Sequence, residues 1–220
     1  MSQIPPDASD GVQLMVTFKV GPNQRQFLIH LDIICQHSPV FDKALKSEFK
    51  EGKEKEITLE ETEEDVLKVD MHWMYTGRVP SFRNKGQKDP TKWGPRESQT
   101  DAEGNEVELT WDYMMSQAYI FGAMCDIWKF CSAIHGAFQH RFEPGDDKTP
   151  TYPSHATIIR LFNNTPENAA MRKTFARQFA KHWRPAGATQ AELKLFKELP
   201  IEFTLMSMAS FAEVRDRLSE

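Results

Sequence analysis

Several cysteines and histidines in the second half of the chain have side chains that can bind a metal ion. Cys131 and His135 are four residues apart, which places two ligands on one face of a helix, and Cys125, His140 and His155 flank them. The group has neither a CxxC pair nor an HExxH pair, and its cysteines lie among aromatic residues. We therefore expect buried thiols and hydrogen-bonded histidines here, and no metal site.

No segment of the sequence carries a known catalytic signature. A nucleophile elbow, a phosphate-binding loop and a dinucleotide-binding glycine motif are all missing. The acidic run at residues 60–65 falls at a predicted helix N-terminus, where the helix dipole favours negative charge. His72 has no nucleophile at a spacing that would make it a general base. We expect a protein that is not an enzyme and that needs no cofactor.

Composition and charge narrow the choice of function further. Hydrophobic residues make up 40% and charged residues 27% of the 220 residues, which is ordinary for a globular chain. A net charge of -5 gives no field that would attract nucleic acid. No run of about 18 apolar residues predicts a membrane span, and the N-terminus does not resemble a signal peptide. The odd cysteine count (Cys35, Cys125 and Cys131) favours reduced, buried thiols in a cytoplasmic or nuclear protein.

The first 37 residues predict two short strands and a short helix. Residues 14–20 alternate between apolar and polar side chains and predict a strand. A glycine–proline–asparagine turn follows, and residues 24–30 then predict the second strand of a hairpin. Residues 31–37 are short and apolar, which favours a buried helix.

Cap residues predict where the following helices begin and end. Ser38 with the proline after it predicts a helix start, and Gly52 predicts the end of that helix. A strand is expected at residues 55–59. Thr62 and the acidic residues after it resemble a capping box for a helix that ends at Gly77.

Composition also divides the rest of the chain. We expect a disordered tail at residues 1–11, a polar insertion at about 81–110 and a linker at 143–150. Residues 112–142 predict helices, with Gly136 as a candidate break. Helices are expected throughout 151–220, and Ser154, Thr165-Pro166 and Pro200 are the predicted starts.

The order of these elements resembles the BTB/POZ domain, and in particular the stand-alone BTB proteins of filamentous fungi. The segments that carry the resemblance are His30-x-Asp32, Ser38-Pro39-Val40-Phe41, Phe49-x-Glu51, Ile57-Thr58-Leu59 and Trp73-Met74-Tyr75-Thr76-Gly77. The resemblance implies an α+β protein, with a small sheet and surrounding helices over residues 12–142 and a helical extension after them. It also implies a protein–protein interaction scaffold that forms a homodimer.

Two pairs of residues are candidates for contact with a partner. Phe49 and Glu51 match a hydrophobic-x-Glu pattern with which some BTB adaptors contact a cullin scaffold. The plainer interpretation, which a motif of only three residues does not displace, is that Phe49 closes the local core and Glu51 is solvated. His30 and Asp32 could form a polar pocket at a partner surface. The simpler interpretation is that they cap and anchor the first helix, and we favour it.

Aromatic and aliphatic residues of the BTB-like part of the chain predict its core. The expected core residues are Phe27, Ile29, Phe41, Leu45 and Phe49. Trp73 and Tyr75 are expected to bury a large area near a helix end, with polar atoms that need partners.

Three hypotheses for the function remain open. The first is a substrate adaptor for a cullin-type ubiquitin ligase, in which residues 150–220 would have to hold the substrate. The second is an oligomerisation or corepressor-recruiting module of a transcriptional regulator, although no zinc finger accompanies it. The third, an enzyme of unrecognised type, lacks any supporting motif.

Overall fold

The computed structural model describes residues 14–79, 99–100, 106–107, 111–142, 152–183 and 190–217. The chain folds into two compact units, which we call unit 1 and unit 2. Unit 1 comprises residues 1–94 and 121–134, and unit 2 comprises 95–120 and 135–220. These units divide the helices at 111–142 between them, whereas the sequence places the boundary at residues 143–150, which lie outside the described residues.

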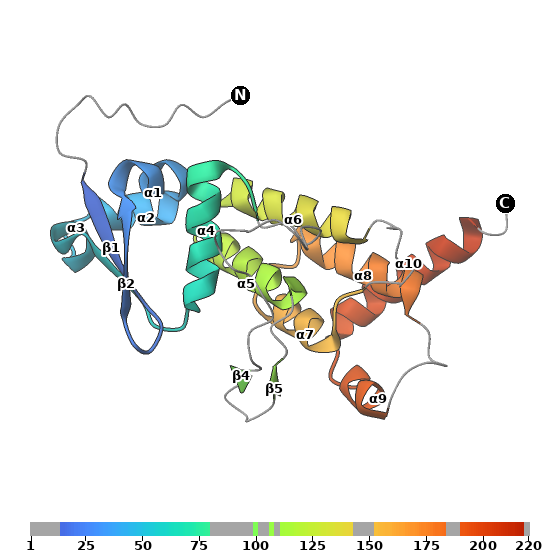
Figure 1. The fold of residues 1–220 in the computed structure, drawn as a ribbon. Coiled ribbons are helices and arrows are strands. Elements are labelled where there is room, and N and C mark those ends of the chain that lie inside the picture. The colour runs from blue at the N-terminus through green and yellow to red at the C-terminus, as the bar shows by residue number, and fades with distance from the viewer. Residues whose placement is uncertain are drawn as a thin grey trace, which may run out of the picture. The chain divides into compact units, whose positions relative to one another are not determined.

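Unit 1 contains a three-stranded mixed sheet with the order β2-β1-β3. Figure 1 labels β1 and β2, the two strands of its hairpin. The strands are β1 (Met15–Val20), β2 (Arg25–His30) and β3 (Glu56–Leu59). The expected hairpin is confirmed, since β1 and β2 are antiparallel with Val16 opposite Ile29. β3 runs parallel to β1, and alternate residues of β1 are fully buried, as one covered face of a sheet requires.

Four helices of unit 1 accompany the sheet. They are α1 (Leu31–His37), α2 (Pro39–Leu45), α3 (Lys50–Glu54) and α4 (Glu64–Thr76). The Ser38 cap is confirmed, because its Oγ accepts a hydrogen bond from the Phe41 N–H at 3.2 Å. Gly77 ends α4 with a φ of 69°, as predicted. The capping box is wrong, since Glu63 is the N-cap of α4 and its side chain makes no capping hydrogen bond.

The single helix predicted between Ser38 and Gly52 is two helices in the structure. α2 ends at Leu45, and α3 starts only after a loop that ends at Phe49. Gly52 therefore lies inside α3 and does not end a helix. A Cβ at this position would lie 1.8 Å from the carbonyl oxygen of Ser47, so the glycine permits a close approach of α3 to the preceding loop.

Aromatic rings and one hydrogen bond hold the core of unit 1 together. Phe18 and Phe41 meet edge to face at 5.2 Å, and the rings of Trp73 and Phe130 are 5.2 Å apart. Ser38 also donates from its Oγ to the carbonyl of Cys125 at 2.6 Å. The start of α2 is thereby tied to the turn between α5 (Trp111–Met124) and α6 (Trp128–Phe142). This turn, and not Gly136, separates the two helices predicted at residues 112–142.

One ionisable side chain in this core lacks partners. Asp70, on α4, is fully buried, and neither carboxyl oxygen has a hydrogen-bond partner in the part of the chain that the structure describes. Burial raises the pKa of Asp70 well above its usual value. The neutral, protonated carboxyl is therefore the form that the folded state favours.

The regular elements in the described part of unit 2 are helices and one short hairpin. Its further elements are β4 (Gln99–Thr100), β5 (Glu106–Val107), α7 (His155–Asn163), α8 (Ala170–His182), α9 (Gln190–Phe196) and α10 (Ile201–Arg217). Its core is rich in phenylalanine, and Phe138 and Phe175 pack edge to face at 5.1 Å. The Ser154 cap is confirmed by a 3.2 Å hydrogen bond from the Thr157 N–H. Apart from the four residues of β4 and β5, the predicted insertion at 81–110 lies outside the described residues.

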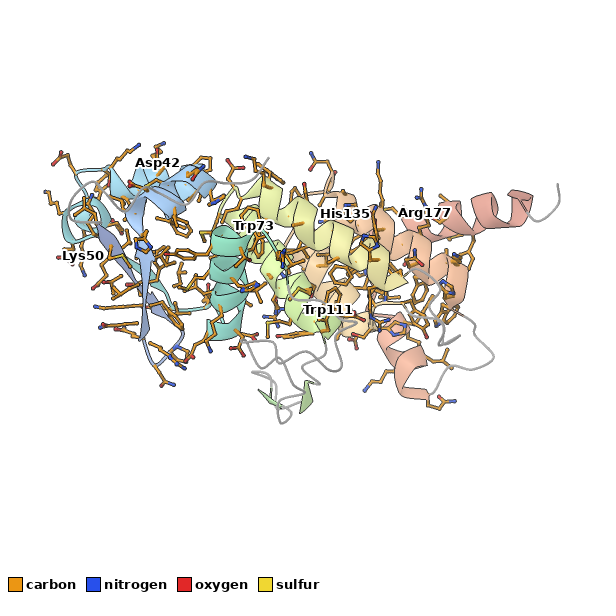
Figure 2. The ribbon with its side chains drawn as sticks, turned by 45° about the horizontal axis from the view of Figure 1, so that its top comes forward. Asp42, Lys50, Trp73, Trp111, His135 and Arg177 are labelled. Carbon is orange, nitrogen blue, oxygen red and sulfur yellow. The ribbon has the colours of Figure 1, made fainter. Side chains whose placement is uncertain are left out.

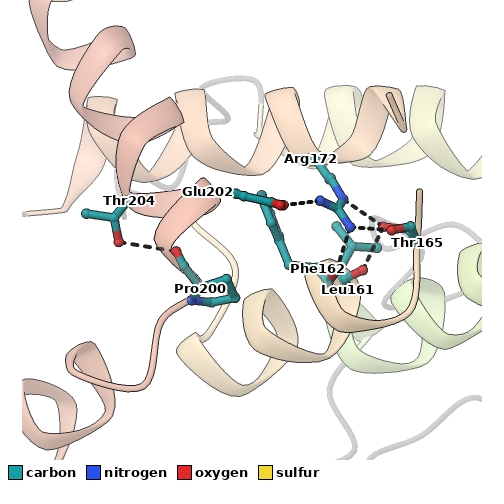
Figure 3. Close-up of polar contacts among 7 residues, drawn as sticks. All are labelled: Leu161, Phe162, Thr165, Arg172, Pro200, Glu202 and Thr204. Carbon is teal, nitrogen blue, oxygen red and sulfur yellow. Dashed lines mark hydrogen bonds and ion pairs between the residues drawn. The ribbon is translucent and has the colours of Figure 1, made fainter. Parts of the chain in front are cut away.

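The predicted helix start at Thr165-Pro166 is wrong, because α8 begins only at Ala170. A buried arginine explains the difference (Figure 3). Nε of Arg172 donates to the Thr165 hydroxyl at 3.2 Å, and its Nη2 donates to the carbonyls of Thr165 and Phe162. Nη1 reaches Glu202 at 2.6 Å. The guanidinium thus links α7, α8 and α10 with hydrogen bonds, and it uses the Thr165 oxygens that would otherwise cap a helix.

None of the helices within the described ranges has the length and apolar composition that crossing a membrane requires.

Candidate protein-interaction surface

Phe49 projects from the loop between α2 and α3, and 76% of its surface is exposed. The expectation that it belongs to the core is therefore wrong. Ile29, Phe41 and Leu45 are buried as expected, whereas Phe27 is only half-buried. An exposed phenylalanine has no stabilising role in its own fold, because the apolar area that it leaves in water contributes nothing to burial.

The loop that carries Phe49 is held in place from both sides. The Ser47 hydroxyl donates to the carbonyl of Ala44 at 2.6 Å and accepts from the Phe49 N–H at 3.3 Å. On the other side, the carbonyl of Phe49 accepts from the Lys53 N–H at 3.1 Å, within the first turn of α3. Together with the close approach of Gly52, these contacts fix the backbone from which the ring projects.

Glu51 lies in the first turn of α3 and is exposed. Lys50, between the two motif residues, faces Glu54 at 3.7 Å, and Figure 2 labels it at the start of α3. Glu51 makes no ion pair with either lysine of α3 among the interactions of the described residues. Its carboxylate is exposed two residues after Phe49, where a partner's donor can reach it.

The structure pairs His30 with a residue that the sequence assigned to the core. His30 Nδ1 lies 2.6 Å from the Tyr75 hydroxyl oxygen, which also accepts from the His30 backbone N–H at 3.1 Å. The Tyr75 hydroxyl can both donate and accept, so it bonds to Nδ1 in either tautomer of the His30 ring. Tyr75 is 43% exposed, so it has the polar partner that was expected but less burial.

The favoured capping role for His30 and Asp32 is not what the structure shows. His30 is the N-cap residue of α1, but its side chain makes no capping hydrogen bond and binds Tyr75 instead. Asp32 lies in the first turn of α1, where its charge is favourable to the helix dipole. Its exposed carboxylate also lines a hollow of about 420 Å³.

The hollow lies between α1, α2 and the end of α3. Its lining residues are Leu31, Asp32, Cys35, Gln36, Asp42, Leu45, Lys46 and Lys55. Asp42, labelled on α2 in Figure 2, is 2.7 Å from Lys46 Nζ, and this hydrogen bond lowers the pKa of Asp42. Burial, together with a hydrogen bond to Asp42, raises the pKa of the Cys35 thiol to about 11. Cys35 is only half-buried, unlike the prediction, but at neutral pH it is a thiol and a poor nucleophile.

The four predicted contact residues do not form one cluster. Phe49 and Glu51 share a loop and a helix turn, Asp32 lines the hollow, and His30 is bound to Tyr75. No hydrogen bond or ion pair within the described ranges joins the first pair to the second. The Phe49–Glu51 pair is therefore a site on its own, which we call the Phe49 surface.

Unit 1 has further exposed apolar residues, which the sequence pattern predicts as core. Val40, Met124 and Trp128 are 45%, 69% and 55% exposed. Val40 follows Ser38, and the other two flank the turn to which Ser38 is hydrogen-bonded. Both segments have helical apolar patterns that predict burial, and only the tertiary arrangement leaves these residues at the surface.

The cysteines and histidines do not assemble a metal site in the part of the chain that the structure describes, where no three or more possible ligands come together. Cys125 and Cys131 form no disulfide and are buried, and burial raises the pKa of both thiols. Nε2 of His135 lies 2.7 Å from the hydroxyl oxygen of Thr174, so this histidine is hydrogen-bonded as expected.

Comparison with known proteins agrees with the geometry of unit 1. Residues 10–88 match the family model of the BTB/POZ domain. The matched range contains the mixed sheet, α1 to α4, the Phe49 surface and the His30–Tyr75 pair. No catalytic family is found, and no curated protein matches the chain. The sheet, its helices and this match identify residues 10–88 as a BTB/POZ domain, which is a protein–protein interaction module.

Proposed function

We propose that the protein is a substrate adaptor whose Phe49 surface binds a cullin-type scaffold. The single observation that carries this proposal is the 76% exposure of Phe49 on a loop with a fixed backbone. Burying a phenylalanine side chain fully in a partner's groove stabilises a complex by about 1.5–3 kcal/mol. Because the loop is ordered before binding, little of that energy is lost to ordering the ring's support.

Glu51 makes this contact more specific. A carboxylate at the rim of an apolar anchor selects partners with a donor at the matching position, and it rejects partners with an acidic group there. The preceding Phe49 would occupy the centre of the contact, where aromatic residues contribute most. An apolar centre with one charged rim residue is the arrangement that a specific protein contact needs.

We also propose that the BTB/POZ domain forms a homodimer through the surface around β2. Leu14 and Leu28 are each 58% exposed, and Tyr75 is 43% exposed beside His30. The Leu31 N–H donates to the carbonyl of Leu14 at 2.8 Å, so Leu14 lies next to the start of α1. Exposed large apolar side chains on one part of a domain mark a surface that a partner can cover, and tyrosine is enriched in such interfaces.

The same proposal includes a cellular location and a role for the C-terminal helices. We infer a cytoplasmic or nuclear location, because a cullin scaffold acts there, and a stand-alone architecture like that of the fungal BTB proteins. In this architecture the helical residues 151–220 would hold the substrate.

The cullin contact is tested by capture of the full chain on a purified cullin. We expect Phe49→Ala and Glu51→Ala together to reduce capture by about tenfold or more, because two central contacts are lost. Lys50→Ala and Leu193→Ala are matched controls, since Lys50 lies between the motif residues and Leu193 is an exposed leucine of unit 2. Equal capture of the double variant and the wild type would exclude this surface as the cullin contact.

A further inference from the structure

α10 has two apolar faces, of which only one is covered within its own unit. Phe203 and Ser207 are buried at 1% and 4% exposure, on the side that packs against α8. Ile201, Leu205 and Met208 are 72%, 60% and 62% exposed. A helix that needs only one packing face in its own fold has no use for a second apolar one.

The exposed residues form a narrow seam. Successive residues of an α-helix are about 100° apart, so Ile201, Leu205, Met208 and the exposed Ala212 fall within a sector of roughly 60°. This sector lies opposite Phe203. Spacings of four, three and four residues are those of a coiled-coil seam, in which each side chain fits between four residues of a facing helix. The geometry therefore calls for an α-helix as the occupant.

Charge indicates which helix fits. Glu202 is the one charged residue from Ile201 to Ala212, and its carboxylate is ion-paired with Arg172 of the same unit at 2.6 Å, so the seam offers no complement to a partner helix with a charged rim. The same uncharged seam on a second copy matches it. The seam is also symmetric, since an antiparallel copy centred between Met206 and Ser207 sets Leu205 opposite Met208 and the large Ile201 opposite the small Ala212.

We propose that α10 of one copy pairs antiparallel with α10 of a second copy through the seam formed by Ile201, Leu205, Met208 and Ala212. The seam spans about 16 Å along the helix, and its contact area is well below the roughly 800 Å² per partner of a stable interface. The association is accordingly weak and depends on protein concentration. It does not rest on the BTB-type dimer or on the cullin contact, because α10 belongs to unit 2.

Sedimentation equilibrium of the full chain over a range of concentrations tests the pairing. Leu205→Glu with Met208→Glu weakens the concentration-dependent association at least tenfold, because it sets carboxylates opposite one another on both copies. Leu193→Glu introduces the same chemical change at an exposed leucine off the seam and leaves the association unchanged. Circular dichroism of the double variant verifies that α10 is still helical.

The two proposed interfaces predict different oligomer masses in sedimentation equilibrium. If the BTB-type dimer forms, the wild type grows beyond a dimer and the double variant stops at the dimer. If that dimer fails, the wild type still converts from monomer to dimer and the double variant stays monomeric. A double variant with the same mass at every concentration as the wild type and Leu193→Glu would overturn the α10 pairing.

Cross-linking tests the direction of the pairing without any destabilising charge. A mixture of Leu205→Cys and Met208→Cys chains forms an intermolecular disulfide under mild oxidation several times faster than either variant alone. The wild type measures the background from Cys35, the only half-buried cysteine among its three. Faster cross-linking of each variant with itself would show parallel helices and overturn the antiparallel arrangement.

Discussion

Unit 1 and unit 2 each bury an ionisable side chain, and they do so in opposite ways. In unit 2, Arg172 is 4% exposed, and its guanidinium donates to two carbonyls, a hydroxyl and a carboxylate. In unit 1, Asp70 is fully buried with no hydrogen-bond partner in the described ranges. Unit 1 also exposes Phe49, a large apolar side chain that would normally be buried. Departures from normal burial of this kind are expected mainly at functional or strained sites.

The largest expected effect is the loss of the Arg172 network. Arg172→Ala should lower the free energy of unfolding by about 3–5 kcal/mol, because buried carbonyls of Phe162 and Thr165 lose their donors and a void remains. Arg177→Ala, at an exposed arginine of the same helix that Figure 2 labels, is the control and should cost little. Denaturant unfolding measures both. A loss for Arg172→Ala no larger than the control's would mean that the network contributes nothing.

Gly52 should be nearly as sensitive. Gly52→Ala would place a Cβ 1.8 Å from the Ser47 carbonyl oxygen, and the backbone shift that relieves this clash should cost about 1–3 kcal/mol. Gly136→Ala, in α6 with no atom within 4 Å of its Cβ, should instead stabilise the protein by about 0.5–1 kcal/mol. If both substitutions stabilise, the close approach of α3 to its preceding loop is not required.

Local signals in the sequence predict the framework well. The alternation of residues 14–30 predicts the hairpin, and Ser38, Gly77 and Ser154 act as caps where expected. These signals depend only on neighbours in the chain. Thr165 fails as a cap because Arg172, seven residues further on, takes its oxygens.

The candidate site was harder to predict. Residue type places Phe49 in the core, and only the split of one helix into α2 and α3 shows it exposed. Asp70 could have been found, because it lies four residues after Val66 and three before Trp73, on the face of α4 that the apolar pattern predicts as buried. The exposure of Val40, Met124 and Trp128 depends on contacts between distant segments and has no local signal.

Substitution of Asp70 should stabilise the protein, unlike the substitutions of Arg172 and Gly52. Asp70→Leu removes a buried group without partners and should raise the free energy of unfolding at pH 7 by about 1–3 kcal/mol. Asp70→Asn keeps the polarity and removes the charge, so it separates the two causes. A destabilised Asp70→Leu variant would mean that the carboxyl has a stabilising partner.

The pH dependence of this effect has a definite sign. Burial raises the pKa of Asp70 in the folded state, so the folded protein keeps a proton that the unfolded chain releases above its usual pKa of about 3.9. Wild-type stability should therefore fall relative to Asp70→Asn as the pH rises from 4 upwards. Unfolding curves of both proteins at several pH values measure this difference. A difference that does not change with pH would contradict the raised pKa.

The smallest expected effect on stability is that of Phe49→Ala. A side chain that is 76% exposed contributes little to folding, so the free energy of unfolding should stay within about 0.5 kcal/mol of the wild type. Phe41→Ala, at a buried ring of the same unit, should cost about 3–5 kcal/mol and serves as the contrast. A large loss for Phe49→Ala would mean that the ring supports its own fold.

The affinity of the full chain for a purified cullin, measured by titration calorimetry, tests the proposed function most directly. The account predicts measurable binding by the wild type, unchanged binding by Lys50→Ala, and affinity at least tenfold lower for the variant with Phe49→Ala and Glu51→Ala, whose folding is intact. Equal affinity of the wild type and the double variant, or no binding by the wild type, would contradict it.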